Sequence, residues 1–313
     1  MINIVLGSMN FGGSADLALS SEIVDVAHEQ GITAIDTANA YTEGRSEEFL
    51  GAIIKERPGR FEIASKVGNP DGPRLGSGPL SAESITASVN TSLERLGLDS
   101  LDLLYFHQPD RSTPFEESLA AVEKLRQTGK VKRLGLSNYS SWQIEQIAEH
   151  SRQNGYLVPS ISQQRYSLLA RRLESEYAEY AQNTGLETIV YNPLAGGLLA
   201  KEVDPTATPE SGRFGNSAQG KSYRERYWNQ EQFDTISQLR TIAQDAGLSL
   251  LELSLRWLLN RPLVNSVLLG PSRPDQIAPS IAAFKAGPLP VELDAACNEA
   301  TDGLLGIAPN YNR

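Results

Sequence analysis

Short apolar runs alternate with longer stretches in which apolar residues recur every three or four positions, through most of the chain. Short runs are typical of buried strands, and the longer periodic stretches are typical of amphipathic helices. The pattern predicts strands at residues 2–6, 34–36, 61–66, 101–107, 134–137, 160–163, 188–191 and 266–269. Helices are predicted between them at 20–30, 46–55, 81–96, 114–128, 140–154, 232–244 and 250–260.

This alternation predicts an α/β fold of the (β/α)8 TIM-barrel type. Eight strand–helix units in 313 residues average about 39 residues each, which fits such a barrel. An open doubly wound sheet is the alternative, and it would usually carry a Gly-x-Gly-x-x-Gly turn after a strand. The nearest segment, Gly7-Ser-Met-Asn-Phe-Gly-Gly13, has the wrong spacing. We therefore expect a barrel.

Two segments depart from the alternation. Residues 195–228 are rich in Gly, Arg and Tyr and follow the seventh strand, so we expect a long loop there, of the kind that is usually functional or disordered. Residues 291–304 predict an extra helix after the eighth unit, followed by a tail that ends at Arg313. No Pro/Ser-rich linker or charge block divides the chain, so we expect one domain over residues 1–313.

Composition narrows the possible partners and the compartment. The formal net charge of -10 argues against a nucleic-acid binder, because nucleic acid is held mostly by clustered Lys and Arg. The single cysteine, Cys297, fits a reducing compartment. We see no signal peptide and no apolar run long enough for a membrane span, so a soluble cytoplasmic protein is expected.

Candidate chemistry gathers at the ends of three predicted strands. Asp36, Lys66 and His107 end the second, third and fourth strands, and Tyr41 lies five residues beyond Asp36. Strand ends of a barrel face one mouth, and neighbouring strands lie ~4.8 Å apart, so these four side chains can converge. A lysine cation stabilises a phenolate and moves the tyrosine pKa toward neutrality, which would let Tyr41 deliver a proton to a carbonyl oxygen.

Each of these residues alone also has an ordinary structural explanation, as a surface aromatic, a turn residue, a solvated strand end or a structural histidine. Their joint placement at successive strand ends favours the catalytic interpretation. A metal-dependent barrel hydrolase or isomerase is a competing class, but three scattered histidines without a His-Glu-x-x-His motif do not supply its ligands, and we expect no metal.

Several motifs together resemble the aldo-keto reductase superfamily along the whole chain. They are Asp36-Thr-Ala-x-x-Tyr41, the strand-end Lys66, Leu-Leu-Tyr-Phe-His107 and Gly135-Leu-Ser-Asn-Tyr139. Later segments resemble the aflatoxin-aldehyde and succinic-semialdehyde reductase branch. These segments are Tyr191-Asn-Pro-Leu-Ala-Gly-Gly, Gly212-Arg-Phe-Gly-Asn, Tyr223-Arg-Glu-Arg-Tyr-Trp228 and Ala308-Pro-Asn-Tyr-Asn-Arg313.

The resemblance implies a cofactor, NADPH, bound across the barrel mouth without a Rossmann domain. It implies that Tyr41 donates the proton, that Asp36 and Lys66 adjust the acidity of Tyr41, and that His107 positions the carbonyl group of the substrate. Nicotinamide contacts are implied for Ser137, Asn138, Gln163 and Tyr191. Pyrophosphate contacts are implied for Asn192, Leu194, Gly196, Gly197, Lys201 and Arg213. The adenosine end would meet Ser272, Arg273, Gln276 and Ser280, although Ser280 stands where the family commonly has Asn.

For function, the resemblance implies an NADPH-dependent reductase of aldehydes, including dialdehydes and aldehydes that bear a carboxylate. Tyr223, Arg226 and Arg313 would form a clamp for such a carboxylate, because Tyr223 and Arg226 share a helical face at a spacing of three. The alternative is a catalytically slow, cofactor-binding regulatory subunit on the same fold. The branch resemblance also suggests a homodimer.

Overall fold

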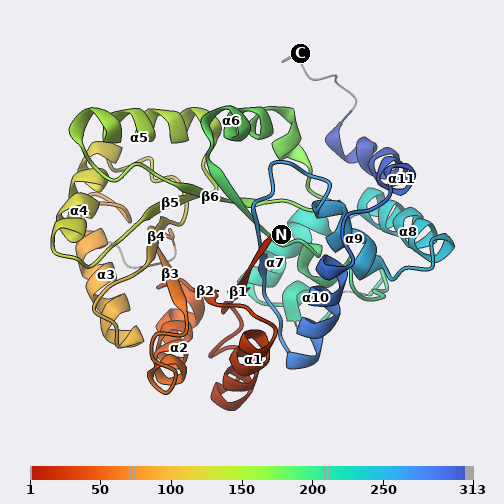
Figure 1. Cartoon of the computed structure of the whole chain (residues 1–313), viewed down its shortest axis with the longest axis horizontal. Coiled ribbons are helices and arrows are strands. Elements are labelled where there is room, and N and C mark those ends of the chain that lie inside the picture. Colours follow the sequence, from red (N-terminus) through yellow and green to blue (C-terminus); the bar gives the residue numbers. More distant parts are fainter. Residues whose placement is uncertain (1, 71, 73–74, 208, 211, 307–313) are drawn as a thin grey trace.

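The computed structural model describes residues 2–70, 72, 75–207, 209, 210 and 212–306. Its centre is a closed barrel of parallel strands in the order β1 to β8, with β8 pairing back onto β1 (Figure 1). The strands are β1 (Asn3–Gly7), β2 (Ala34–Asp36), β3 (Glu62–Val67), β4 (Leu103–Phe106), β5 (Leu134–Ser137), β6 (Ile161–Arg165), β7 (Glu187–Tyr191) and β8 (Ser266–Leu269). The predicted (β/α)8 TIM barrel is confirmed.

Helices surround the barrel (Figure 1). They are α1 (Leu17–Glu29), α2 (Arg45–Lys55), α3 (Ala82–Leu96), α4 (Phe115–Gln127), α5 (Ser141–Asn154), α6 (Tyr177–Thr184), α9 (Leu250–Leu258) and α10 (Ile277–Lys285). Two more, α8 (Gln230–Asp245) and α11 (Val291–Asp302), pack against each other outside this ring. Among the described helices, none is both long and apolar enough to span a bilayer.

Local sequence signals set the helix ends. The Ser81 side chain accepts a hydrogen bond from the Ser84 amide at the start of α3, and Gly97 ends that helix at φ 64°. Helix α5 begins with a capping box between Ser140 and Gln143. Such caps satisfy amide groups at the start of a helix and carbonyl groups at its end that lack partners within the helix.

The barrel interior is built in layers by the alternation of side chains along each strand. Ala64, Leu103, Tyr105, Ile161 and Ile189 pack together inside the barrel. A Cβ on Gly135 would lie 2.5 Å from the Tyr105 ring, so β5 needs glycine at this point. One layer further toward the carboxyl ends, the same inward faces carry the candidate polar residues.

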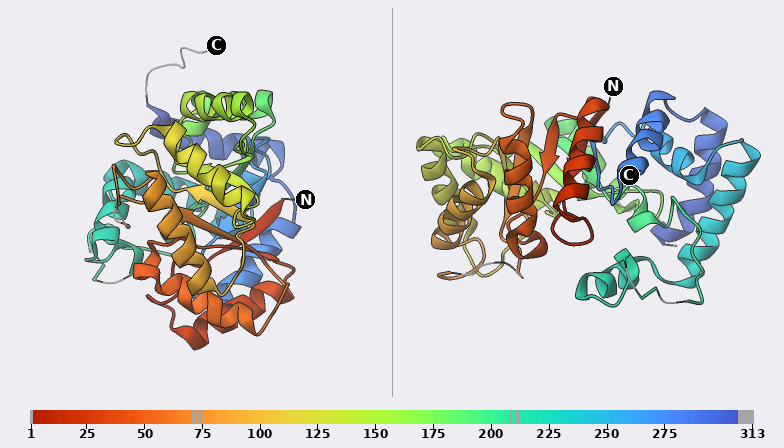
Figure 2. Two further views of the ribbon diagram at one scale, coloured as in Figure 1. Left: turned by 90° about the vertical axis from the view of Figure 1, so that its left-hand side faces the viewer. Right: turned by 90° about the horizontal axis from the view of Figure 1, so that it is seen from below.

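The segment after β7 differs from its prediction as a loop. It contains a ten-residue helix, α7 (Ala218–Tyr227), and two short 3-10 turns, Ala195–Gly197 and Gly212–Phe214. Helix α7 has few apolar residues, so periodicity does not reveal it; Ser217 caps its start by accepting from the Gly220 amide. In the right-hand view of Figure 2 this helix lies on the opposite side of the barrel from the N-terminus.

Candidate active site

Asp36, Lys66 and Tyr41 form a connected group at the carboxyl ends of β2 and β3. The Lys66 side chain is 0% exposed, and its ammonium group forms an ion pair with Asp36 Oδ1. The same Nζ donates to the Thr37 carbonyl oxygen at 2.8 Å and lies 3.2 Å from the Tyr41 hydroxyl. Lysine thus links the carboxylate directly to the phenol, as the spacing of the strand ends predicts.

Gln163 joins this group from across the barrel. Its side chain is 3% exposed, and Nε2 donates to Asp36 Oδ2 at 2.9 Å. The two carboxylate oxygens of Asp36 are therefore held by different partners, Lys66 and Gln163. The family resemblance implies a nicotinamide contact for Gln163, and its contact with Asp36 was not predicted, because the two residues are 127 positions apart.

His107 follows β4 and stands beside Tyr41. The two rings meet edge to face, with centroids 5.7 Å apart and planes at 82°. Burial, with the charge of Lys66, lowers the pKa of His107 from 6.5 to about 3. The imidazole is therefore neutral at pH 7, and its buried Nδ1 has no hydrogen-bond partner among the described residues.

The electrostatics of Tyr41 and Lys66 correct one expectation. Burial raises the pKa of Tyr41, and Lys66 lowers it by a smaller amount, so the net direction is upward. Burial also opposes the charge of Lys66, but Asp36 and Tyr41 outweigh it and raise the pKa of the ammonium group. Lys66 lowers the pKa of the Tyr41 phenol, as expected, but desolvation raises that pKa by a larger amount.

A second ion pair, between buried Glu47 and partly buried Arg95, supports the turn that carries Tyr41. Glu47 is 0% exposed, accepts from the Ser65 hydroxyl at 2.6 Å and pairs with Arg95 at 3.1 Å. Arg95 also donates to the Asn39 carbonyl oxygen at 3.4 Å. These contacts connect β3, next to Lys66, to the segment just before Tyr41. No motif or periodicity in the sequence indicates these contacts.

Ser137, Asn138 and Tyr191 form a polar cluster on the far side of the mouth. Asn138 donates from Nδ2 to the His107 carbonyl oxygen at 2.9 Å and to the Ser137 hydroxyl at 3.0 Å. Its Oδ1 accepts from the Tyr191 hydroxyl at 2.7 Å. The structure brings these three predicted nicotinamide ligands together.

The segment after β7 starts with residues that are predicted to wrap a pyrophosphate. Asn192 Oδ1 accepts from the Tyr223 hydroxyl at 3.1 Å, while its buried Nδ2 lacks a partner among the described residues. Gly197 has φ 104°, and an added Cβ would meet only the Lys201 side chain, at 3.6 Å. An orphaned amide donor beside an open glycine backbone is an arrangement that suits phosphate oxygens. Leu194 and Gly196 complete the same turn.

Arg213 bridges three of the loops around the mouth. Its guanidinium donates to Asn10 Oδ1 at 2.9 Å, and Asn10 Nδ2 donates to the Pro271 carbonyl oxygen at 2.9 Å. The segment after β7 is thereby connected to the loops after β1 and β8.

The predicted adenosine contacts follow β8. Gln276 Oε1 accepts from the Ser272 amide at 2.8 Å, and Arg273 pairs with Asp275 while remaining 66% exposed. The Ser280 hydroxyl donates to the Gln276 carbonyl oxygen at 2.9 Å inside α10 and is buried. Ser280 does not present its hydroxyl to a ligand in this arrangement, so its adenosine contact stays a prediction without geometric support.

Tyr223 and Arg226 share one face of α7, as predicted. The Arg226 guanidinium carbon lies 5.6 Å from the Tyr223 ring centroid, and Arg213 lies 5.5 Å from it. The Tyr223 side chain is buried, whereas Arg226 is exposed. Arg313, the third predicted member of the clamp, lies outside the described residues.

Backbone conformations with positive φ also concentrate at this mouth. Among the described residues, the non-glycine residues with positive φ are Thr42, Glu43, Asn138, Asn192 and Ala195. All of them follow β2, β5 or β7. Backbone in this region is strained for residues with a Cβ, and such strain is often found at functional sites.

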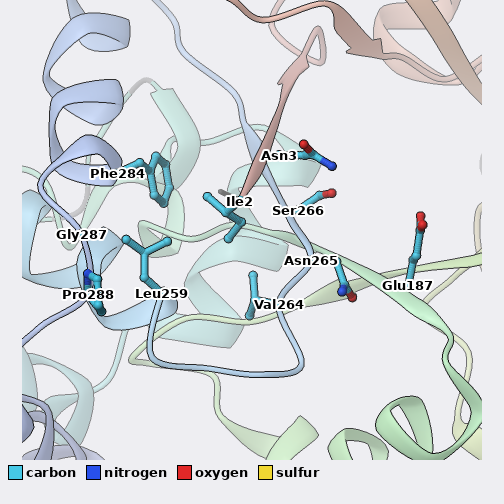
Figure 3. A pocket seen from close by; sticks show the side chains of 10 residues that line it. All are labelled: Ile2, Asn3, Glu187, Leu259, Val264, Asn265, Ser266, Phe284, Gly287 and Pro288. Atoms are coloured by element: carbon cyan, nitrogen blue, oxygen red, sulfur yellow. The ribbon is translucent and has the colours of Figure 1, made fainter.

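A hollow of about 590 Å³ lies at the opposite end of the barrel (Figure 3). It is lined by Asn3 and Ser266, which begin β1 and β8, together with residues such as Phe284 and Pro288. This is the amino-terminal face, which in such barrels serves stability. Among the described residues, no group of three His, Cys, Asp or Glu side chains is placed to hold a metal ion.

Comparison with known proteins identifies the family. The aldo/keto reductase family model matches residues 3–302. The chain is 35% identical over 324 residues to human aflatoxin B1 aldehyde reductase member 2. The aligned region covers 99% of this chain and 89% of that protein. It is 35% identical over 321 residues to human aldo-keto reductase family 7 member A3, covering 99% and 96%.

A more distant relative is a probable voltage-gated potassium channel subunit beta from Arabidopsis thaliana. It is 31% identical over 292 residues, covering 91% of this chain and 88% of that protein. The family match spans nearly the whole barrel, including the strand ends that carry Asp36, Lys66 and His107. The chain therefore belongs to the aldo/keto reductase family.

Proposed function

We propose that this protein reduces aldehydes to alcohols with NADPH, and that Tyr41 is the proton donor. One observation carries the assignment: a fully buried Lys66 ammonium group contacts both the Asp36 carboxylate and, at 3.2 Å, the Tyr41 hydroxyl. The two human relatives are an aldehyde reductase and an aldo-keto reductase, and this likeness supports the same reaction class.

The residues of the site divide the acid–base work. Bound NADPH would supply the hydride that reaches the carbonyl carbon. Tyr41 gives its hydroxyl proton to the carbonyl oxygen, and Lys66 stabilises the phenolate that remains. Asp36, held by Gln163, keeps Lys66 charged and in place. His107, neutral at pH 7, hydrogen-bonds the carbonyl oxygen without adding a second positive charge.

The cofactor would lie across the mouth. Ser137, Asn138 and Tyr191 form the polar cluster that fits the nicotinamide end. Asn192, Gly197 and Arg213 supply an orphaned amide, an open backbone and a guanidinium for the phosphates. We propose NADPH rather than NADH because exposed Arg273 near the end of this path suits an additional phosphate.

The test is Tyr41→Phe, which keeps the ring but removes the proton donor. Turnover of 4-nitrobenzaldehyde should fall by at least about 10²-fold, the usual scale for a general acid. The Kd for NADPH, measured from the quenching of protein fluorescence, should stay close to that of the unchanged protein. Near-normal turnover in this variant would refute the proton-donor assignment.

A regulatory subunit is the competing function, and the potassium channel subunit among the relatives favours it specifically. That function predicts tight NADPH binding with very slow oxidation in the presence of 4-nitrobenzaldehyde. A rate at which each molecule turns over many times per minute would exclude it. A single slow turnover would instead support it against our proposal.

A further inference from the structure

The turn that carries Tyr41, residues 39–44, has a strained backbone. Thr42 and Glu43 both have positive φ, 48° and 60°, in a region that residues with a Cβ rarely adopt. Such a conformation persists only where the surrounding structure holds it in place. Tyr41 is fixed to the backbone just before it, since its amide donates to the Ala38 carbonyl oxygen at 3.1 Å. The contacts that hold this turn therefore decide where the Tyr41 hydroxyl lies.

Arg95 holds this turn from helix α3. Its guanidinium donates to the Asn39 carbonyl oxygen at 3.4 Å. It also lies against Gly44, which has φ 93° and where an added Cβ would lie 2.2 Å from the guanidinium carbon. Arg95 thus contacts the first and the last residue of the turn. Thr42 holds its middle, because the threonine hydroxyl donates to the Phe11 carbonyl oxygen at 2.9 Å.

The start of helix α2 receives the Arg95 side chain. Glu47 is 0% exposed and pairs with Arg95 at 3.1 Å, while its other carboxylate oxygen accepts from the Ser65 hydroxyl at 2.6 Å. Gly51, one turn further along α2, lets the two helices approach closely, because an added Cβ would lie 2.1 Å from the Arg95 carbonyl oxygen. Side chains on a helix lean toward its N-terminus, so Arg95 reaches along α3 toward the mouth.

Lys66 is held by a separate set of contacts. Its ammonium group binds the Asp36 carboxylate and the Thr37 carbonyl oxygen, and neither contact involves Arg95. Loss of the Arg95 contacts therefore lets the turn move relative to Lys66, instead of moving both groups together. The distance that changes is the one between Lys66 Nζ and the Tyr41 hydroxyl, 3.2 Å in this structure.

We propose that Arg95 is a positioning residue for the reaction, because it holds the turn at residues 39–44 so that the Tyr41 phenol keeps its contact with Lys66. This inference rests on the proposed role of Tyr41 as proton donor, and it adds a residue outside the catalytic group. Proton transfer needs the acid within hydrogen-bonding distance of the carbonyl oxygen. A displaced turn should therefore slow the chemical step and leave cofactor binding unchanged, since the residues proposed to hold the phosphates follow β7 and β8.

The experiment measures turnover of 4-nitrobenzaldehyde by Arg95→Met. We expect kcat to fall by about tenfold to a hundredfold, the scale of a misplaced catalytic group, while the Kd for NADPH changes less than about twofold. The solvent isotope effect on kcat should rise, because proton transfer from Tyr41 becomes slower relative to the other steps. In a Tyr41→Phe background the same substitution should change the residual kcat less than about twofold, because the group that Arg95 positions is gone.

Two further variants separate positioning from stability. Arg95→Met leaves Glu47 buried without a counter-charge, which destabilises the fold. The Arg95→Met/Glu47→Gln double variant removes that charge but still lacks the contacts with the turn, so it should fold and its kcat should stay low. Arg57→Met is the matched control, because Arg57 is 12% exposed and pairs with Asp25 at 2.7 Å beyond the other end of α2. This control should lower stability without lowering kcat.

Normal turnover in the double variant would overturn the inference, because the loss in Arg95→Met would then come from the buried charge alone. A loss of kcat in the Tyr41→Phe background as large as that in the unchanged protein would also overturn it. An equal loss of kcat in Arg57→Met would have the same meaning, because any weakened ion pair of α2 would then slow the enzyme.

Hydrogen exchange separates this inference from the proposed function, because it needs no aldehyde. Measured by mass spectrometry, the amides of residues 39–44 should exchange faster in the double variant than in the unchanged protein, and Arg57→Met should leave them unchanged. If the unchanged protein reduces no aldehyde but exchange in the turn depends on Arg95, the reductase proposal fails and the hold on the turn stands. If aldehydes are reduced but both exchange and kcat are independent of Arg95, the positioning role fails and the reductase stands.

Discussion

Removing the buried charge of Lys66 should reveal how the Asp36–Lys66 pair contributes to the fold. Lys66→Met keeps the length of the side chain but deletes its ammonium group. Asp36, which is 2% exposed, keeps the hydrogen bond from Gln163 and loses its counter-charge. Removing one member of a buried ion pair costs about 3–5 kcal/mol, and we expect the free energy of unfolding at pH 8 to fall by that amount.

The loss should come from the Asp36 carboxylate, which Lys66→Met leaves buried without a counter-charge. An Asp36→Asn/Lys66→Met double variant carries no buried charge here and should recover much of the loss at pH 8.

The assay is urea unfolding at pH 8, monitored by tryptophan fluorescence and circular dichroism, for the unchanged protein, both single variants and the double variant. A coupling energy of more than about 1 kcal/mol between the two sites is expected, because the groups are in contact. A loss below about 1 kcal/mol for Lys66→Met at pH 8, or simple additivity of the two single changes, would refute the reasoning.

Two further predictions concern His107 and the cofactor arginines. The pKa of His107 is about 3 in the folded protein and about 6.5 in the unfolded chain. The neutral imidazole therefore contributes stability that is present above pH 6.5 and is lost as the pH falls toward 3. The free energy of unfolding should change by up to about 1.4 kcal/mol per pH unit in this window. His107→Gln should remove this component from the pH dependence of unfolding, and unchanged slopes would contradict the buried neutral state. The unchanged protein should bind NADPH more tightly than NADH in a fluorescence titration. Arg273→Met should reduce the difference in affinity between the two cofactors, whereas Arg213→Met should weaken the binding of both cofactors. Equal affinities of the unchanged protein for the two cofactors would exclude an additional phosphate contact.

Strand periodicity was sufficient to predict the barrel and the convergence of Asp36, Lys66 and His107. The reason is geometric: parallel strands end at one face, so a residue's place at a strand end fixes its place in the molecule. Tyr41 could be added because only a short turn separates it from Asp36. The motif resemblance then supplied the remaining candidate residues.

The contacts that the sequence could not predict depend on packing between distant segments. Gln163 reaches Asp36 across the barrel, and Arg95 reaches Glu47 from a neighbouring helix, so neither pair leaves a local periodic signal. The upward pKa shift of Tyr41 depends on how completely its surroundings exclude water, which spacing does not determine. Only the turn of helix α7 that carries Tyr223 and Arg226 was predicted, because the aromatic residues of this helix pack against the barrel mouth without forming an apolar stripe.

The positive-φ residues around the mouth have a consequence for adaptation to heat. Strained backbone at a residue with a Cβ costs about 1–3 kcal/mol, and glycine at Asn138, Asn192 or Ala195 would relieve part of it. The same substitutions at Asn138 and Asn192 would delete side chains that hold Tyr191 and Tyr223. Ala195 has no polar side chain to lose, but its methyl group is buried in the core. In a lineage evolving toward higher growth temperature, packing therefore decides the choice at Ala195, while the two asparagines remain constrained by the chemistry of the mouth.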